Sequence, residues 1–204
     1  YQQALTLFRK LGREDGIAAS LQNIGMVYDS RGQYDKAMEK FQEALVIARK
    51  LGQEDEIALS LDKIGTVYNY WGQYDKAMEN YQQALTLFRK LGMEDAIVIS
   101  LNNIGTVYKS LGQYDKAIEN YQQVLTIARR LGKEDEIATS LNNIGLVYKS
   151  WGQYDKAIEN YQQALTLFRK LGTEDKIATS LNNIGMVYNS WGQYDKAIEN
   201  YQQG

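Results

Sequence analysis

The chain contains 204 residues, of which 23 are Lys or Arg and 25 are Asp or Glu, so the formal net charge is −2. This near balance provides no basic footprint for nucleic acid or for an anionic membrane, and we expect neither as a partner. His and Cys are absent, which removes the commonest general base, the thiol nucleophile and the preferred metal ligands, so we expect no enzyme, no metal and no cofactor.

A single unit of 40 residues recurs five times along the chain. The copies are so similar that residues 81–120 and 161–200 differ at only seven positions. A period between 20 and 50 residues is typical of solenoids, in which each unit buries its apolar face against its neighbours. Function is therefore to be sought on a surface that repetition builds.

We predict two helices in each repeat, because two apolar patterns of helical spacing alternate and no proline interrupts them. In chain order we expect a lone second helix at about 1–11, helix pairs at about 14–51, 54–91, 94–131 and 134–171, and a truncated pair at about 174–203. In the pair at 134–171, Leu141 and Ile144 lie on one stripe of the first helix, and Tyr161 faces inward from the second. Gly152 and Gly172 end these helices, since glycine tolerates positive φ. The expected fold is an all-α solenoid of stacked antiparallel helix pairs.

Two recurrent features call for a structural explanation. A glycine such as Gly145 lies inside every first helix, where it costs about 1 kcal/mol relative to alanine. We expect it to allow close approach of the paired helix, with Ala157 as the small residue opposite. An acidic pair such as Glu174 and Asp175 stands just before each first helix, where we expect it to cap the helix and complement its dipole.

The pattern of conserved spacing within each repeat resembles the tetratricopeptide repeat family. The positions that carry the resemblance in the fourth repeat are Leu141, Ile144, Gly145, Tyr148, Gly152, Tyr154, Ala157, Tyr161, Ala164 and Leu165. The repeat is longer than the usual 34 residues, and arginine stands where proline commonly ends the second helix, as in the repeats of kinesin light chain and of spindle-orientation adaptors. The resemblance implies a right-handed superhelix whose first helices line a concave groove for a peptide or partner protein.

The positions at which the five copies differ fall mainly on one face of the first helix, opposite its apolar stripe. The resemblance places this face in the groove, while neutral drift on an exposed surface is the alternative. The candidate peptide-binding residues are Asn23, Met26, Asp62, Lys63, Thr66, Asn102, Asn103, Thr106, Lys109, Asn142, Asn143, Leu146, Lys149, Asn182, Asn183 and Met186.

Pairs of amide side chains recur on this face, although asparagine is a poor residue for a helix interior. One hypothesis is that these amides bind the backbone of an extended peptide, because each offers a donor and an acceptor. The other is that they bond one another across successive first helices and align the stack. Both hypotheses remain open.

Charges and tryptophans also vary between copies. Asp29 and Asp62 lie in the first two repeats, and Lys109 and Lys149 in the third and fourth, which suggests a ligand that is acidic toward the C-terminal half. Some tetratricopeptide domains clamp a C-terminal carboxylate with basic groove residues, including a lysine near the N-terminal end. That lysine is missing here, so we do not expect this chain to bind a C-terminal carboxylate in that way. Trp71, Trp151 and Trp191 end their first helices, where we expect them to cover the hairpin turn rather than to form an interface.

The predicted function is a non-catalytic scaffold that binds an extended peptide or partner protein. The alternative is a structural spacer whose uncapped ends stack head to tail, with Tyr201 and Gln202 at the repeat positions of Tyr1 and Gln2. Neither a signal peptide nor a membrane-spanning apolar run is visible, and we expect a cytoplasmic protein. Because the chain starts at Tyr1 and ends within a repeat at Gly204, we expect it to be a segment of a longer protein.

Overall fold

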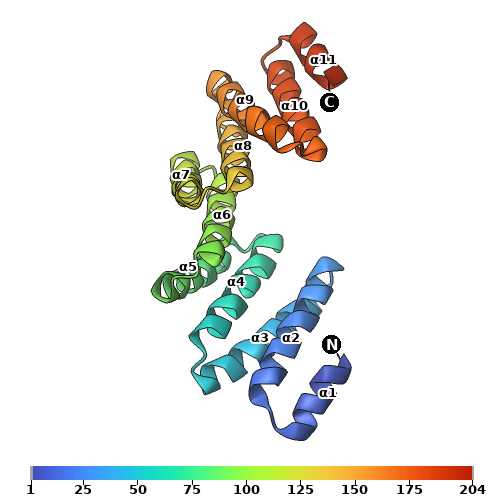
Figure 1. Cartoon of the computed structure of the whole chain (residues 1–204), viewed down its shortest axis with the longest axis vertical. Coiled ribbons are helices and arrows are strands. Elements are labelled where there is room, and N and C mark those ends of the chain that lie inside the picture. Colours follow the sequence, from blue (N-terminus) through green and yellow to red (C-terminus); the bar gives the residue numbers. More distant parts are fainter. Residues whose placement is uncertain (1, 204) are drawn as a thin grey trace. The chain divides into compact units, whose positions relative to one another are not determined.

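The computed structural model describes residues 2–203, and within this range every regular element is an α-helix (Figure 1). In chain order the helices are α1 (Gln2–Leu11), α2 (Glu14–Ser30), α3 (Tyr34–Leu51), α4 (Glu54–Tyr70), α5 (Tyr74–Leu91), α6 (Glu94–Ser110), α7 (Tyr114–Leu131), α8 (Glu134–Ser150), α9 (Tyr154–Leu171), α10 (Glu174–Ser190) and α11 (Tyr194–Gln203). The even-numbered helices are the first helices of the repeats, and the odd-numbered helices are the second ones.

The chain divides into two compact units, residues 1–107 and residues 108–204, which we call the N-terminal unit and the C-terminal unit. In the N-terminal unit, each helix from α1 to α4 packs against the next one in the chain. In the C-terminal unit, the same holds for each helix from α7 to α10. Neighbours run antiparallel, because turns of only two or three residues join them. Within each unit the predicted all-α fold of stacked helix pairs is confirmed.

The turns are built by glycines in the left-handed conformation. At the end of α2, Gly32 has φ of 68°, its N–H donates to Asp29 O at 2.8 Å, and the N–H of Gln33 donates to Tyr28 O at 2.9 Å. These two bonds form a Schellman motif, which satisfies carbonyl groups that the helix end leaves unpaired. The predicted helix ends at Gly152 and Gly172 follow the same rule, with φ of 75° and 68°.

The core lies between the first and the second helices, and both contribute buried side chains. In the C-terminal unit, Tyr161 and Leu165 of α9 pack in one cluster with Leu181 and Ile184 of α10. On another side of α9, Phe168 belongs to a cluster that includes residues of α7 and α8. Since full burial of such a side chain stabilises by about 1.5–3 kcal/mol, each second helix links its repeat to its neighbours.

The glycines inside the first helices lie against aromatic rings. A Cβ atom added at Gly145 would lie 2.8 Å from Cε1 of Tyr161, and one at Gly25 would lie 2.5 Å from Cε1 of Phe41. The predicted close approach is confirmed, and the predicted alanine takes part in the second repeat, where a Cβ at Gly65 would lie 3.2 Å from the backbone oxygen of Ala77. The nearest atoms, however, belong to the aromatic ring. The ring of Tyr161, rather than Ala157, occupies the space that a side chain at Gly145 would need, because the aromatic residue of the second helix crosses there.

The acidic pairs lie inside the first turn of each first helix and not before it. Thr173, which precedes Glu174, is the N-cap of α10, and its side chain makes no capping hydrogen bond. In the first turn of α2, the carboxylate of Asp15 has a lowered pKa. The side-chain hydrogen bond from Arg13 lowers it most, and the backbone N–H of Gly16 lowers it further.

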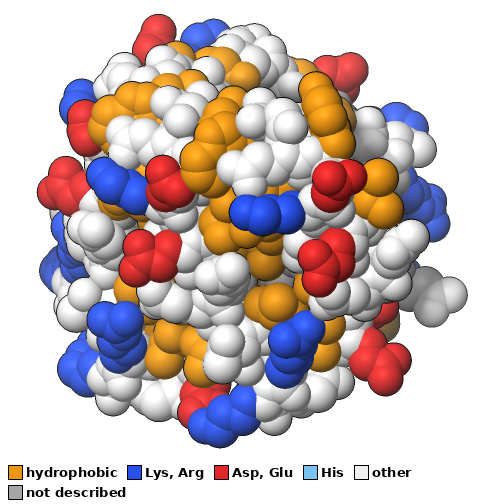
Figure 2. All heavy atoms as spheres, turned by 90° about the horizontal axis from the view of Figure 1, so that it is seen from above, with side chains coloured by type: hydrophobic (Ala, Val, Ile, Leu, Met, Phe, Trp, Pro, Cys, Tyr) orange, Lys and Arg blue, Asp and Glu red, His pale blue; other side chains and the backbone are white. Residues whose placement is uncertain are grey.

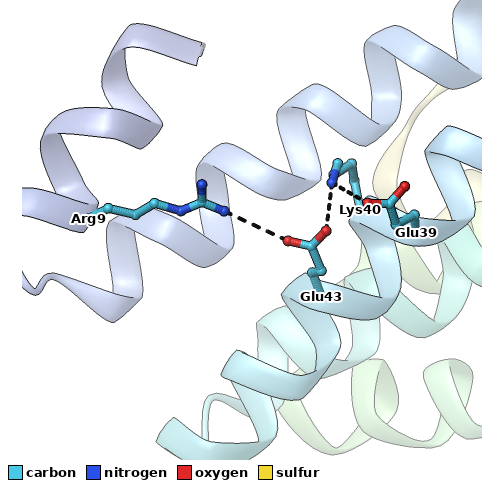
Figure 3. A network of polar contacts seen from close by, with 4 residues as sticks. All are labelled: Arg9, Glu39, Lys40 and Glu43. Carbon is cyan, nitrogen blue, oxygen red and sulfur yellow. Dashed lines mark hydrogen bonds and ion pairs between the residues drawn. The ribbon is translucent and has the colours of Figure 1, made fainter.

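An ion pair joins α1 to α3 on the surface of the N-terminal unit, beside two ion pairs within α3 (Figure 3). Glu43 accepts a hydrogen bond from Nζ of Lys40 at 2.6 Å and lies 3.9 Å from Nη2 of Arg9. Lys40 also contacts Glu39 at 2.7 Å, and its pKa is raised, most of all by that hydrogen bond. Such surface pairs contribute only about 0–1 kcal/mol each, so the packing of the helices dominates.

The surface carries interspersed charges. On the face drawn in Figure 2, Lys and Arg side chains alternate with Asp and Glu, and hydrophobic side chains are visible between them. Of the helices in residues 2–203, none combines the length and the apolar character that a membrane span requires.

Candidate functional site

We call the variable face of α2, α4, α6, α8 and α10 the first-helix face. Its predicted residues are Asn23 and Met26 from α2, Asp62, Lys63 and Thr66 from α4, Asn102, Asn103, Thr106 and Lys109 from α6, Asn142, Asn143, Leu146 and Lys149 from α8, and Asn182, Asn183 and Met186 from α10. Met26 and Asn182 are exposed, Asp62 and Asn183 are buried, and the others are half-buried. The half-buried side chains lie in an environment where a ligand could reach them without unfolding the stack.

In the N-terminal unit, Gln22 of α2 reaches across to α4. Its Nε2 donates to Oε2 of Glu56 at 2.6 Å, to the backbone oxygen of Glu56 at 3.2 Å and to Oγ of Ser60 at 3.0 Å. Burial raises the pKa of the Glu56 carboxyl, the charge of Asp55 raises it further, and the bond from Gln22 opposes the shift. Glu56 was not among the residues that the sequence singled out, although an acidic residue there differs from Gly16 and Ala96 in neighbouring copies.

Asp62 of α4 occupies the repeat position of Gln22, one repeat later, and is only 3% exposed. Oγ of Ser100 donates to its Oδ1 at 2.8 Å, Asn103 also hydrogen-bonds it, and Nζ of Lys63 lies 3.9 Å from its Oδ2. Burial raises the pKa of Asp62, and these three partners oppose the rise. A carboxylate here therefore joins α4 to α6 at a cost in desolvation.

A second carboxylate, Asp29, lies on the first-helix face of α2. Burial raises its pKa, and the charge of Lys63 opposes this shift. Its Oδ1 is buried and has no hydrogen-bond partner among the described residues. In the N-terminal unit, Lys63 thus lies within electrostatic range of both Asp29 and Asp62.

In the C-terminal unit, two asparagine side chains connect the first helices α8 and α10. Nδ2 of Asn183 in α10 donates to Oδ1 of Asn142 in α8 at 3.1 Å. The spacing of 41 residues equals that between Asn103 and Asp62, so the same contact recurs in both units. This is the bonding that the stack-aligning hypothesis expects.

A lysine occupies the first-helix face of the C-terminal unit. Nζ of Lys149 lies 3.7 Å from Sδ of Met186, and its pKa is lowered by burial. The corresponding residue in α2 is Asp29, so the two units differ in the sign of the charge at equivalent positions.

The three tryptophans pack beside the hairpin turns, as the sequence suggested, but each remains more than a third exposed. Trp71 meets Tyr68 edge-on with ring centroids 5.8 Å apart, and Trp191 lies 5.9 Å from Tyr154. The contact with the tyrosine that opens the preceding second helix was not anticipated, because it joins residues 37 positions apart.

Among residues 2–203, no group of three or more His, Cys, Asp or Glu side chains is arranged to hold a metal ion.

A family model for the tetratricopeptide repeat matches residues 1–50, 30–90, 96–170 and 152–204. The chain belongs to the tetratricopeptide repeat family. The resemblance inferred from Tyr148, Gly152, Tyr154 and Ala157 is thereby confirmed. No curated protein matches the chain.

Solved structures of tetratricopeptide type share this fold at low sequence identity. BtubC (BKLC) from P. vanneervenii is 24% identical, with a TM-score of 0.84 over 99% of this chain and 85% of that one. A kinesin light chain with nearly identical repeats from Podosopora anserina is 21% identical, with a TM-score of 0.76 over 91% of this chain and 92% of that one.

A Rap protein, solved in complex with Competence and Sporulation Factor, is 23% identical, with a TM-score of 0.77. The match covers 94% of this chain but only 53% of the Rap protein. At such identities these structures establish the fold that the chain shares with them.

Proposed function

We propose that this chain is a non-catalytic scaffold that binds an extended peptide or a partner protein along the first-helix face. The observation that carries the proposal is the separation of constant and variable positions. The residues that stack the repeats, such as Tyr161 and Leu165, are buried, whereas Met26, Leu146 and Lys149 differ between copies and remain accessible. Membership of the tetratricopeptide repeat family supports a role in protein interaction.

We call the amide side chains at the repeat positions of Asn142 and Asn143 the amide ladder. These side chains would both bind the ligand and align the repeats. An asparagine side chain has two donors and an acceptor with two lone pairs, so the bond from Asn183 to Asn142 uses only part of their capacity. Asn103 and Asn183 bond the preceding first helix and would align the repeats, and half-buried amides such as Asn143 would also meet the ligand backbone. At about 1 kcal/mol net per hydrogen bond, several contacts and some apolar burial amount to micromolar affinity, roughly −8 kcal/mol.

A screen of displayed random peptides tests the proposal. The screen is run on the intact chain and on a variant with Asn103, Asn143 and Asn183 changed to alanine. The matched control variant carries Gln82→Ala, Gln122→Ala and Gln162→Ala, which remove three exposed amides from second helices. Circular dichroism first establishes a temperature at which all three proteins are folded.

We expect peptides that bind the intact chain and the glutamine variant but lose affinity for the asparagine variant by tenfold or more, since each lost bond is worth about 1 kcal/mol. If no peptide is enriched, or if the asparagine variant binds the same peptides equally well, the ladder only aligns the repeats and the proposal fails.

Self-assembly is the second candidate, and the exposed apolar side chains of α1 and α11 favour it. Leu7 and Leu11 of α1 are 59% and 68% exposed, and Ile198 of α11 is 54% exposed. Head-to-tail stacking would cover these side chains. The head-to-tail stacking expected of Tyr1 concerns a residue outside those that the structure describes, and it stays a prediction. A cytoplasmic location also stays a prediction.

A further inference from the structure

A small concave pocket recurs beside the hairpin turns, away from the first-helix face. In the N-terminal unit it is lined by residues 32–36 and Trp71 and has a volume of about 300 Å³. In the C-terminal unit it is lined by residues 152–156 and Trp191 and has a volume of about 290 Å³. The linings correspond residue for residue at a distance of 120 positions, and we call these sites the turn-edge pockets. Each one combines the turn of one repeat with the tryptophan of the next.

An indole forms one wall of each pocket. Trp71 is 36% exposed and Trp191 is 39% exposed, which leaves part of each ring surface open to solvent. Trp191 is flanked by Tyr154 at 5.9 Å, and Trp151 is flanked by Tyr114 at 5.7 Å in the same way. An aromatic face fixed by a second ring attracts flat or cationic groups.

An aspartate carboxylate also lines each pocket. Asp35 and Asp155 lie in the first turn of their helices and are exposed. Neither takes part in an ion pair within residues 2–203. Each carboxylate therefore lies near an indole with its charge still available to a ligand.

The lysine that follows each aspartate also lines the pocket, and its ammonium group contacts an aromatic ring. Nζ of Lys36 lies 5.4 Å from the ring centroid of Tyr28 and donates to Oε1 of Gln33 at 3.3 Å. Nζ of Lys156 lies 5.3 Å from the ring centroid of Tyr148. These contacts hold each ammonium over the first helix of its own repeat, while the indole belongs to the next repeat. They also show that the turn edge already accommodates cations on aromatic rings.

We propose that the turn-edge pockets bind the guanidinium groups of arginine side chains on a partner protein. The guanidinium stacks on the indole of Trp71 or Trp191, and its N–H groups donate to Asp35 or Asp155. Arginine fits better than lysine, because its planar, weakly hydrated group can stack and donate in a fork at once. A single contact is weak, but pockets that recur with the repeat favour a partner with several arginines, since linked contacts reinforce one another.

The chain contains its own reporters for this site. Its three tryptophans, Trp71, Trp151 and Trp191, all end first helices at the same repeat position. The indole N–H resonances in a ¹H–¹⁵N spectrum of the whole chain therefore report on the turn edge alone, once Trp→Phe variants assign them.

The experiment titrates N-acetylarginine amide into the labelled chain at constant ionic strength. We expect saturable shifts of the Trp71 and Trp191 indole resonances. N-acetylcitrulline amide has nearly the same shape without the charge, and it should bind roughly tenfold more weakly. Absence of saturable shifts, equal binding of the citrulline probe, or tighter binding of N-acetylphenylalanine amide would each overturn the proposal.

Asp155→Asn supplies the internal control. We expect it to weaken binding of the arginine probe at Trp191 several-fold and to leave binding at Trp71 unchanged, because the change affects only one pocket. The unchanged Trp71 resonance also reports that the chain is folded. Equal affinity at Trp191 before and after the substitution would show that the aspartate does not bind the ligand.

Discussion

At the scale of single residues, the copies of the repeat act as internal controls on one another. Asp62 stands where the third, fourth and fifth repeats carry Asn102, Asn142 and Asn182. It makes the same kind of contact between first helices, yet it must do so as a nearly fully buried carboxyl group. The position therefore tolerates a charge that the fold does not need.

We expect Asp62→Asn to raise the free energy of unfolding by on the order of 1 kcal/mol at pH 7. Burial raises the pKa of Asp62 in the folded state above its ordinary value of 3.8. The folded protein then loses stability as the pH rises from that ordinary value to the raised pKa, since the unfolded chain gives up the proton first. The asparagine variant escapes this loss, so its advantage should grow across that window and vanish below it.

Urea unfolding at a series of pH values measures this difference. Asp155→Asn is the control, because that side chain is exposed and its replacement should change the free energy of unfolding by less than about 0.5 kcal/mol. An asparagine variant at position 62 that is less stable than the parent at pH 7 would show that the carboxylate contributes more through Ser100 and Lys63 than burial costs.

The glycine inside each first helix lends itself to a second test. Gly145→Ala should gain about 1 kcal/mol of helix propensity but lose about 1–3 kcal/mol through the clash with Tyr161, whose Cε1 lies 2.8 Å from the added Cβ. We expect a net decrease in the free energy of unfolding. In a Tyr161→Leu background the clash is removed, and the same substitution should be neutral or stabilising.

Denaturant unfolding of the four proteins gives the coupling free energy between the two positions. A coupling free energy of zero would mean that the ring of Tyr161 is not the reason for a glycine at position 145.

At the scale of helices, packing and turn geometry dominate over surface charge. Each second helix is buried against neighbouring first helices, and glycines with positive φ end both helices of a repeat. Ion pairs such as Lys170 with Glu134 recur between the two helices of a pair, at Lys90 with Glu54 and at Lys50 with Glu14. Their side chains are well exposed, so we expect these ion pairs to contribute little to the stability of each helix pair.

We expect Lys170→Met to lower the free energy of unfolding by less than about 0.5 kcal/mol at low salt. The pair with Glu134 is screened by water, and added salt should abolish the difference. Thermal unfolding at two ionic strengths measures both effects, with Lys10→Met on α1 as a control for the loss of a surface charge. A loss above 1 kcal/mol that survives high salt would assign this pair a structural role.

At the scale of the whole molecule, stability in a repeat array is a sum of units and of interfaces between neighbours. The terminal helices α1 and α11 therefore have fewer neighbouring helices than the inner ones. Because of this, their apolar side chains are more exposed than those of the inner helices. Leu11 and Ile198 are 68% and 54% exposed, whereas Leu51 and Ile158, at the equivalent positions of inner second helices, are 39% and 8% exposed.

We expect the chain to associate reversibly as its concentration rises, because association of α1 with α11 of another copy would remove these apolar side chains from water. Light scattering over a concentration series measures the mass. A variant with Leu7→Lys and Ile198→Lys should remain a monomer where the parent associates. If the parent is a monomer at every concentration, self-assembly is not a property of these ends.

The sequence by itself determined the repeat, the helices and the turns, since these depend on local periodicity and on residues such as Gly152 and Gly172. It also determined the family, because the spacing of Tyr148, Tyr154 and Tyr161 recurs in every copy, with Phe41 in place of the third tyrosine in the first one. Only the tertiary structure decided which partners those residues meet. The ring of Tyr161 beside Gly145, the burial of Asp62, and the bond from Asn183 to Asn142 all join residues of different helices. Such contacts depend on how side chains of neighbouring helices interlock, and a pattern along one helix does not contain that information.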